Sequence, residues 1–307
     1  MSRIAVVGSI NTDFVVRAAR YPSPGETLIG DSFAMYGGGK GANQAIAAAR
    51  LGASVEFFGA AGRDPQSIER VQQLSADGVG AANIVMFDGF GGIAIIQVEE
   101  LSGQNSITLV PGANMLLSED LVSPRLEAWS QPADLLCMQL EVPLETVAAT
   151  LALGRRLGMA TVLNAAPFDA RVTERLPLVD HLLVNEIEAG QLLGDSPVSP
   201  DGAAAAGARL LALGVGWTVI ITLGGHGAVL VDNNGPLPIP APSVRVVDTT
   251  GAGDAFAGAF CTGLAKGMAA RDAARSAVIA GSLAVQRPGA QPSLPTAKEL
   301  AAAVDRL

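Results

Sequence analysis

The second half of the chain alternates short apolar runs with longer helical stretches, and this rhythm strongly constrains the fold. Helical patterns at 118–129 and 144–158 flank an apolar run at 133–140, and further apolar runs follow at 160–164 and 181–185. Such alternation is typical of parallel strands joined by right-handed helical crossovers. The sequence therefore predicts a three-layer α/β/α fold with a mainly parallel central sheet.

Shorter β-like stretches lie outside this alternation. Residues 14–36 contain extended pieces joined by a Pro/Gly turn, and 92–98 and 105–110 are again β-like, with a glycine-containing turn between them. They predict a small sheet beside the main one, a lid formed by segments at about 12–36 and 90–110. Otherwise we expect residues 1–307 to form a single α/β domain, a size that 307 residues allow.

Charge and cysteine content exclude several classes of partner. The net charge is −9 and there is no basic stripe, which argues against nucleic acid and anionic membrane as partners. The two cysteines, Cys137 and Cys261, are too few for a disulfide framework and suit a reducing compartment. There is no signal-peptide pattern, and no apolar run reaches the roughly 18 residues of a membrane span. We expect a cytoplasmic protein.

Residues 246–260, VVDTTGAGDAFAGAF, combine a phosphate site with an acid. The apolar pair at 246–247 predicts a strand that enters a helix through the small residues 251–253, which leaves free N–H groups at the helix start. These donors and the helix dipole attract phosphate. Asp254 then suits a general base that takes a proton from an attacking hydroxyl. The alternative is an N-cap aspartate in a tight turn.

A second glycine-rich stretch, GGGKGANQAIAAARLG at 37–52, predicts a turn and an Ala-rich helix that stops at Gly52. Its GxGxxA spacing resembles a dinucleotide fingerprint, but that motif should end the first strand, which is predicted here at residues 3–8. It is not a P-loop either, because glycine instead of Ser or Thr follows Lys40. The stretch predicts close approach of backbone to a ligand, with Asn43 in the first helical turn.

Polar residues follow several predicted strands at the edge where open α/β sheets bind ligands. Asn11 and Asp13 follow the first strand, and Glu141 follows the run at 133–140. Asn185 and Glu188 begin a helix on one face, and such a pair can serve phosphate and hydrated Mg²⁺. Turn formation, solvation and helix capping are the respective alternatives.

A glycine turn, TLGGHG at 222–227, ends a predicted strand. It would carry the phosphates or ribose of a nucleotide, or form a plain hairpin into the following AVLVD run. His181 and His226 are the only histidines in the sequence. Because two are too few for a His-rich metal site, neither is assigned to catalysis.

Together these stretches resemble the ribokinase-type (PfkB-like) family of sugar kinases. GGGKGANQAIAAARLG is similar to the first family signature, and DTTGAGDAFAGA is similar to the second, which carries the catalytic aspartate. Further stretches resemble the ribokinases within this family, in family order along the chain: GSINTD (8–13), YPSPGET (21–27), VPGAN (110–114), MQLE (138–141), NAAP (164–167), TLGGHG (222–227) and GAQPS (289–293).

The resemblance implies ATP-dependent phosphorylation of D-ribose at its 5-hydroxyl, with Asp254 as general base and a backbone anion hole at Gly251, Ala252 and Gly253. It implies a sugar pocket made by Asn11, Thr12, Asp13, Gly39, Lys40, Gly41, Ala42, Asn43, Glu141 and Asp254. Phosphate and Mg²⁺ would be organised by Asn185 and Glu188. ATP would lie against Thr222, Leu223, Gly224, Gly225, His226, Gly227, Gly253 and Val278. A loop binding K⁺ would comprise Asp248, Thr250, Ala284, Arg287, Gly289 and Ser293.

The resemblance also implies a homodimer, in which the open edges of the lid strands are covered. Two positions depart from the family pattern. Val278 stands where an Asn or His often lies near adenine, and Gly91 stands where ribokinases often carry Ser or Thr. The first bears on selectivity for ATP and the second on preference for D-ribose.

Three alternatives therefore stay open. The first is a related kinase that acts on deoxyribose, a ketohexose or a nucleoside. The second is a non-catalytic sugar or nucleotide sensor on the same scaffold, because fold does not fix function. The third is an NAD-dependent oxidoreductase, which would bind its cofactor at 37–42.

Overall fold

The computed structural model describes residues 2–100 and 104–306. The strands of its large sheet are β1 (Ile4–Val7), β4 (Val55–Gly62), β5 (Gly80–Phe87), β8 (Leu135–Met138), β9 (Ala160–Asn164), β10 (His181–Asn185), β11 (Thr218–Thr222), β12 (Ala228–Asp232) and β13 (Gly235–Ile239). Their order is β13-β12-β11-β10-β9-β8-β1-β4-β5. All neighbours from β11 to β5 are parallel, and β12 and β13 add an antiparallel edge. The predicted mainly parallel sheet is confirmed.

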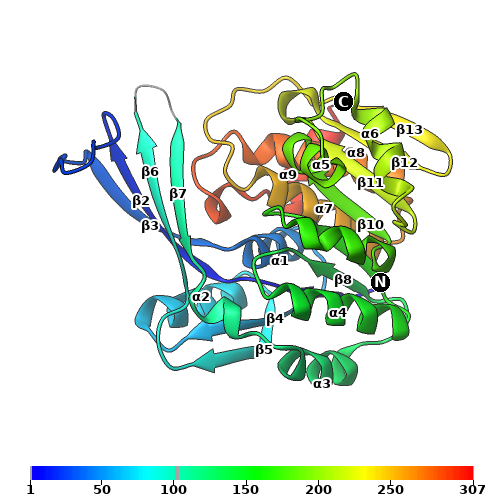
Figure 1. Cartoon of the computed structure of the whole chain (residues 1–307), viewed down its shortest axis with the longest axis horizontal. Coiled ribbons are helices and arrows are strands. Elements are labelled where there is room, and N and C mark those ends of the chain that lie inside the picture. Colours follow the sequence, from blue (N-terminus) through cyan, green and yellow to red (C-terminus); the bar gives the residue numbers. More distant parts are fainter. Residues whose placement is uncertain (1, 101–103, 307) are drawn as a thin grey trace.

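Helices cover both faces of this sheet (Figure 1). They are α1 (Lys40–Arg50), α2 (Pro65–Ala76), α3 (Glu119–Trp129), α4 (Leu144–Arg156), α5 (Glu186–Leu193), α6 (Ala203–Leu211), α7 (Ala252–Ala265), α8 (Ala270–Ala284) and α9 (Ala297–Val304). Ile4 and Val6 of β1 join the core formed with α1, α7 and α8, whereas Ala5 and Val7 join the core formed with α3 to α6. Successive strand residues point to opposite faces, so β1 belongs to both cores and the three-layer prediction is confirmed.

Four more strands form a separate small sheet. They are β2 (Asn11–Ala18), β3 (Ser32–Gly38), β6 (Gly92–Glu99) and β7 (Asn105–Val110), in the order β3-β2-β6-β7. Figure 1 shows this sheet, in blue and cyan, projecting to one side of the large sheet. Only residues 8–10 separate β1 from β2. The end of a central strand thus leads directly into the small sheet.

The main departures from the predicted elements are at the sheet edges and before α7. Residues 246–247, both described, form no strand; the N–H groups of Val247 and Asp248 instead donate to the Val285 carbonyl at the end of α8. Strands β5 and β13 were not predicted. The proline pattern of β13 disguises it, yet proline is tolerated on an edge strand, where one side of the backbone needs no partner. Within the described parts of the chain, no helix has both the length and the apolar character that crossing a bilayer requires.

Candidate active site

Asp254 lies in the first turn of α7 and is 7% exposed. Asn43 Nδ2 donates to its Oδ2 at 2.8 Å, and Gln44 Nε2 donates to its Oδ1 at 3.1 Å. Burial raises the pKa of Asp254, while the Lys40 ammonium and the two amides oppose that rise. The N-cap of α7 is Gly251, and Asp254 is engaged by α1, so the alternative of an N-cap aspartate is wrong.

The start of α7 lies beside this carboxylate; its Ala252 N–H donates to the Thr249 carbonyl at 3.3 Å, whereas Gly253 is exposed. Gly251 has φ 79°, a left-handed conformation that favours glycine, and a Cβ there would lie 3.0 Å from Ala290 Cα. A Cβ on Gly253 would meet no heavy atom within 4 Å, so its backbone is open to a ligand. The first N–H groups of a helix lack partners within that helix. This helix start is therefore suited to bind an anion.

Polar side chains around the end of β1 are held by fixed hydrogen bonds. Asn114 Nδ2 donates to Asn11 Oδ1 at 2.8 Å. The Glu141 carboxylate accepts from Ser9 Oγ at 2.6 Å and from the Lys40 N–H at 3.0 Å, both at Oε2. The structure thus brings Glu141, which follows β8, against the start of α1. Such a set of short, fixed polar groups suits a polyhydroxylated ligand.

Three carboxylates and one ammonium interact electrostatically here. Burial, followed by repulsion from Glu141 and Asp254, raises the pKa of Asp13 to about 7, against a smaller opposing effect of Arg70. Burial of the Lys40 ammonium disfavours its charge, but the nearby carboxylates, including Asp254 and Glu141, outweigh this and raise its pKa. Lys40 therefore stays positively charged among the acids.

The glycine turn before α1 is shaped by the chain itself. A Cβ on Gly39, whose φ is 88°, would lie 2.8 Å from the Ser9 carbonyl oxygen, and a Cβ on Gly41 would lie 2.6 Å from the Ser9 nitrogen. The close approach of backbone that was predicted for this turn is thus to the chain between β1 and β2. Thr12 and Ala42, which were predicted to belong to the sugar pocket, are both buried. Because β3, which precedes this turn, is antiparallel to β2 in the small sheet, the dinucleotide-fingerprint interpretation of 37–42 is wrong.

A cavity of about 370 Å³ lies between the glycine turn after β11, the start of α7 and the C-terminal half of α8. Predicted nucleotide-site residues that line it are Thr222, Gly224, Gly225, Gly227, Gly253 and Val278. Leu223 is buried and His226 is exposed, and neither lines the cavity. Other residues that line the cavity were not predicted, namely Ala241, Pro242, Ser243, Val244, Val246, Thr249, Phe256, Gly281, Ser282 and Val285. Of these, only Val246 belongs to the pair that was predicted as a strand.

Asn185 and Glu188 form a capping box at the start of α5. The Asn185 side chain accepts from the Glu188 N–H at 2.8 Å, and the Glu188 carboxylate accepts from the Asn185 N–H at 2.9 Å. Both residues therefore cap α5, and their role toward phosphate and Mg²⁺ stays a prediction. Burial raises the pKa of Glu188, whereas the Asn185 N–H and Lys40 oppose that rise. Within residues 2–100 and 104–306, no group of three or more His, Cys, Asp or Glu side chains is arranged to hold a metal ion.

The predicted cation loop is closed by Asp248. Its Oδ1 accepts from Thr250 N–H at 2.9 Å and from Thr250 Oγ1 at 2.7 Å, and its Oδ2 accepts from Gly289 N–H at 2.8 Å. Burial opposes ionisation of Asp248, but these donors outweigh it and keep its pKa low. The Ser293 hydroxyl donates to the Ala290 carbonyl at 2.8 Å. This loop reaches the start of α7 through the Gly251–Ala290 contact described above.

Ala284 and Arg287 are the other two residues predicted for the cation loop. The Ala284 carbonyl accepts from the Arg287 N–H at 3.2 Å, and the Arg287 guanidinium pairs with Glu299 at 3.0 Å. These contacts of both residues thus lie within the C-terminal segment.

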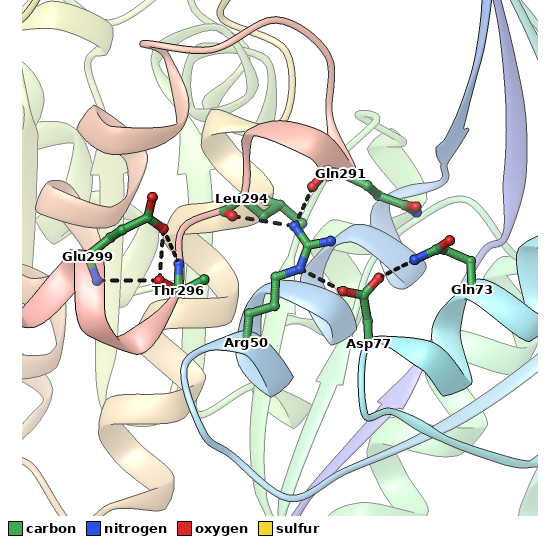
Figure 2. Close-up of polar contacts among 7 residues, drawn as sticks. All are labelled: Arg50, Gln73, Asp77, Gln291, Leu294, Thr296 and Glu299. Atoms are coloured by element: carbon green, nitrogen blue, oxygen red, sulfur yellow. Dashed lines mark hydrogen bonds and ion pairs between the residues drawn. The ribbon is translucent and has the colours of Figure 1, made fainter.

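Arg50 at the end of α1 ties this loop to the rest of the molecule (Figure 2). Its NH1 donates to the Gln291 carbonyl at 2.6 Å, and its Nε donates to Asp77 Oδ1 at 2.7 Å. Gln73 Nε2 donates to the other Asp77 oxygen at 2.8 Å. One guanidinium therefore joins the C-terminal ends of α1 and α2 to the short 3₁₀-helix η4 (Gln291–Ser293).

Comparison with known proteins gives a consistent result. Residues 1–297 match the model of the pfkB family carbohydrate kinases. The chain belongs to this family. It is 39% identical to a ribokinase of Schizosaccharomyces pombe over 98% of this chain and 97% of that protein. The ribokinase of Thermotoga maritima superposes with a TM-score of 0.89 at 32% identity, covering 99% of this chain and 100% of its own. The structure of Arabidopsis thaliana ribokinase complexed with ribose and ATP superposes with a TM-score of 0.85 at 30% identity, with 99% of both chains covered.

The two pfkB-family signatures of the sequence lie on α1 and α7, which pack together. A Cβ on Gly258 of α7 would lie 2.5 Å from Ala47 Cβ and 2.9 Å from the Ala48 nitrogen of α1. Only a residue without a side chain permits this approach. The contact places Asn43 of the first signature beside Asp254 of the second.

Four polar residues of this pfkB-family site were missed by the sequence analysis: Ser9, Gln44, Asn114 and Gln139. All four are buried. A signal for Gln44 does exist, because it is a polar residue inside an otherwise small and apolar helix, directly after Asn43. For Gln139 and Asn114 the partners are about 95 to 104 residues away in sequence, and no local pattern reveals them.

Proposed function

We propose that this protein transfers the γ-phosphoryl group of ATP to the 5-hydroxyl of D-ribose, giving D-ribose 5-phosphate and ADP. The observation that carries the proposal is the buried Asp254 carboxylate beside the open backbone of Gly253 at the start of α7. The hydroxyl proton passes to Asp254, the new O–P bond forms, and the bond from phosphorus to the leaving ADP oxygen breaks. Gly251, Ala252 and Gly253 form the anion hole for the transferred group.

D-Ribose binds between the end of β1 and the start of α1. Carboxylates accept hydrogen bonds from sugar hydroxyls and the ammonium donates to them, so Asp13, Glu141 and Lys40 would fix several hydroxyls at once. The amides of Asn11 and Asn43 complete this set. In support, the ribokinase relative from Arabidopsis thaliana is described with ribose and ATP bound.

ATP occupies the cavity of about 370 Å³, with its base against Val278 and its phosphates toward Gly253. Mg²⁺, which neutralises phosphate charge when bound, would be organised through water by Asn185 and Glu188. K⁺ would sit in the loop closed by Asp248, whose carbonyl and hydroxyl oxygens are the ligand type that such a cation takes. Because this loop touches Gly251, the ion would act on the anion hole.

The proposal extends to the organisation of the chain. The whole chain works as one domain, with the small sheet as a lid over the sugar. The protein forms a homodimer through this lid and acts in the cytoplasm on small molecules. The apolar outer residues of the small sheet support the dimer, as discussed below.

The central test is substitution of the base. Asp254→Asn keeps the shape of the side chain but removes its proton affinity, so turnover with D-ribose and MgATP should fall by roughly 10²–10⁴-fold. A coupled assay for ADP release measures this, and thermal unfolding checks that the variant folds. Asp272→Asn, on the exposed first turn of α8, is the control and should retain activity. Wild-type turnover in Asp254→Asn would refute the assignment of the base.

A panel of acceptors tests the substrate. The same assay with D-ribose, 2-deoxyribose, D-fructose and adenosine, in K⁺ and in Na⁺, should give the highest kcat/KM for D-ribose and a higher rate in K⁺. A higher kcat/KM for another acceptor would favour the related-kinase alternative. ATP binding without turnover of any acceptor would favour the sensor.

A further inference from the structure

A chain of side-chain amides reaches Asp254 from the protein interior. Gln44 is 1% exposed, and Gln139 is fully buried. Gln44 Nε2 donates to Asp254 Oδ1 at 3.1 Å and to Asn164 Oδ1 at 3.0 Å, while Gln44 Oε1 accepts from Gln139 Nε2 at 2.7 Å. One amide thus contacts three polar side chains from α7, β9 and the end of β8.

A backbone carbonyl sets the direction of this chain. The Leu183 carbonyl can only accept, and it takes a hydrogen bond from Asn164 Nδ2 at 3.2 Å. Asn164 must then turn its oxygen toward Gln44, so Gln44 must turn its NH₂ group toward Asn164 and Asp254. A reversed Gln44 amide would place its oxygen against two acceptors. The donor that faces Asp254 is therefore fixed by the network.

The other side of the Gln44 amide is fixed as well. Besides Gln139, the Cys137 thiol donates to Gln44 Oε1 at 3.3 Å, so both polar ends of this amide are satisfied. Gln139 has room only because residue 8 is glycine, since a Cβ there would lie 2.2 Å from Gln139 Oε1. Residues at the ends of β1 and β8 thus hold these two glutamine side chains in fixed positions.

We propose that Gln44 is the positioning residue of the catalytic base, holding the Asp254 carboxylate in the orientation and ionised state in which it accepts the hydroxyl proton. The inference rests on the proposed function, because it takes Asp254 as the base. Asn43 binds the other carboxylate oxygen but also belongs to the proposed sugar pocket. Gln44 contacts protein groups, so its effect on the reaction passes through Asp254. An N–H donor favours the ionised carboxylate over the protonated form.

Gln44→Met tests this, because methionine has similar length but no amide. We expect kcat to fall about 10–100-fold, from loss of a hydrogen bond to a charged group. KM for D-ribose and for ATP should stay close to wild type. At saturating substrates the acidic limb of the pH–kcat profile should move to higher pH by about one unit. The coupled ADP assay between pH 5.5 and 9 measures all three quantities.

Gln44→Glu gives a sharper signature. A protonated glutamic acid donates one hydrogen bond to Asp254, whereas an ionised one repels it. Relative to Gln44→Met, the Glu variant should be more active at the acidic end of the profile and less active at the alkaline end. A purely structural role of Gln44 would not produce this inversion.

Two further variants complete the design. Thr262→Val, also on α7, removes a buried hydroxyl that donates to the Gly258 carbonyl at 2.8 Å, and should leave kcat and the pH profile unchanged. If Gln44→Met does not fold, Gln139→Met is used instead, because it removes the hydrogen bond from Gln139 Nε2 to Gln44 Oε1. It should lower kcat by at least about threefold, with the same shift of the acidic limb of the pH–kcat profile.

The outcomes separate this inference from the proposed function. A wild-type kcat and pH profile in the Gln44 variants, or in Gln139→Met, together with an inactive Asp254→Asn, would overturn the inference and leave the proposed function intact. The same loss and the same shift in Thr262→Val would also overturn it. Full activity of Asp254→Asn would overturn both.

Discussion

Asp13 lies buried among like charges, and this makes its ionisation costly. Its pKa is raised from 3.8 to about 7, first by burial and then by Glu141 and Asp254. Below about pH 4 the carboxyl is neutral in both the folded and the unfolded chain, and its contribution to stability is fully present. As pH rises toward 7, only the unfolded chain ionises, so the free energy of unfolding decreases across this window. Above the folded pKa the loss is complete.

Asp13→Asn removes this penalty while keeping the size of the side chain. Without ligands, the variant should unfold at a higher temperature than wild type at pH 8, and the difference should shrink toward pH 5. Thermal unfolding at a series of pH values checks this. An equal difference at all pH values would contradict the assigned cause.

The same ionisation should govern the affinity for sugar. An ionised Asp13 is a stronger acceptor for hydroxyl groups, so wild-type affinity for D-ribose should rise between pH 6 and pH 8. In Asp13→Asn the affinity should be lower, by about 10-fold at pH 8, and nearly independent of pH. Calorimetry without nucleotide measures both. A parallel pH dependence in the two proteins would assign the effect to another group.

At the scale of residues, the sequence predicts side chains that stand in recognisable local patterns. Asp254 follows a glycine-rich turn, and Asn43 follows another, so each is visible without its partner. The hydrogen bond between them spans 211 residues. Their pairing, and the seat of Gln44 behind Asp254, depend on how α1 packs on α7, which no local pattern encodes.

At the scale of elements, Arg50 connects α1 to the end of α2 and to η4 (Figure 2). Its guanidinium satisfies the Gln291 carbonyl and the Asp77 carboxylate, which are both partly buried. Arg50→Met leaves these acceptors with fewer donors, so we expect a loss of about 1–3 kcal/mol in the free energy of unfolding. Because the loop after α8 is then less firmly held, half-activation by K⁺ should require more K⁺. Urea unfolding and a K⁺ titration of activity measure the two effects.

Arg275→Met provides the matched control. Arg275 forms an ion pair with Asp272 on the surface of α8, and its side chain is 53% exposed. Such pairs contribute about 0–1 kcal/mol, so this variant should be nearly neutral and its response to K⁺ unchanged. Equal behaviour of the two variants would contradict a special role for Arg50.

Elements with strong periodicity were predicted well, and those without it were not. The buried strands of the large sheet read as apolar runs, and the helices between them show clear patterns. Strand β13 at one edge lacks such a run, and the apolar run of β5 at the other edge, 84–87, is short and only half-buried. The pair at 246–247 is apolar yet exposed, because it borders the cavity beside Gly253 and the small sheet instead of joining the large sheet.

At the scale of the whole molecule, the small sheet presents an apolar outer surface. Exposed hydrophobic side chains on the face that carries Phe14 are Phe33, Met35, Ile95 and Val110, whereas Ile107 and Leu109 lie on the opposite face, which carries Asp13. Contiguous apolar surface of this kind marks interaction sites, and the sheet also carries open strand edges. These features support the proposed homodimer.

Ile95→Glu should disrupt that dimer, because it places a charge within the apolar face. At micromolar concentration we expect the mass of a dimer for wild type and of a monomer for the variant, measured by light scattering or sedimentation. Val304→Glu replaces an exposed apolar residue on α9 and should leave the dimer intact. A monomeric wild-type protein would refute the homodimer.

The short connection at residues 8–10 has a consequence for release of the product. Asn11 and Asp13 belong to β2 of the small sheet, whereas Glu141 and Asp254 belong to the large unit. If the small sheet swings about this connection, a sugar bound as proposed loses Asn11 and Asp13, while Glu141 and Asp254 stay with the large sheet. Opening of the site and weakening of sugar binding would then be a single movement. The phosphorylated sugar could therefore not stay fully bound in the open molecule.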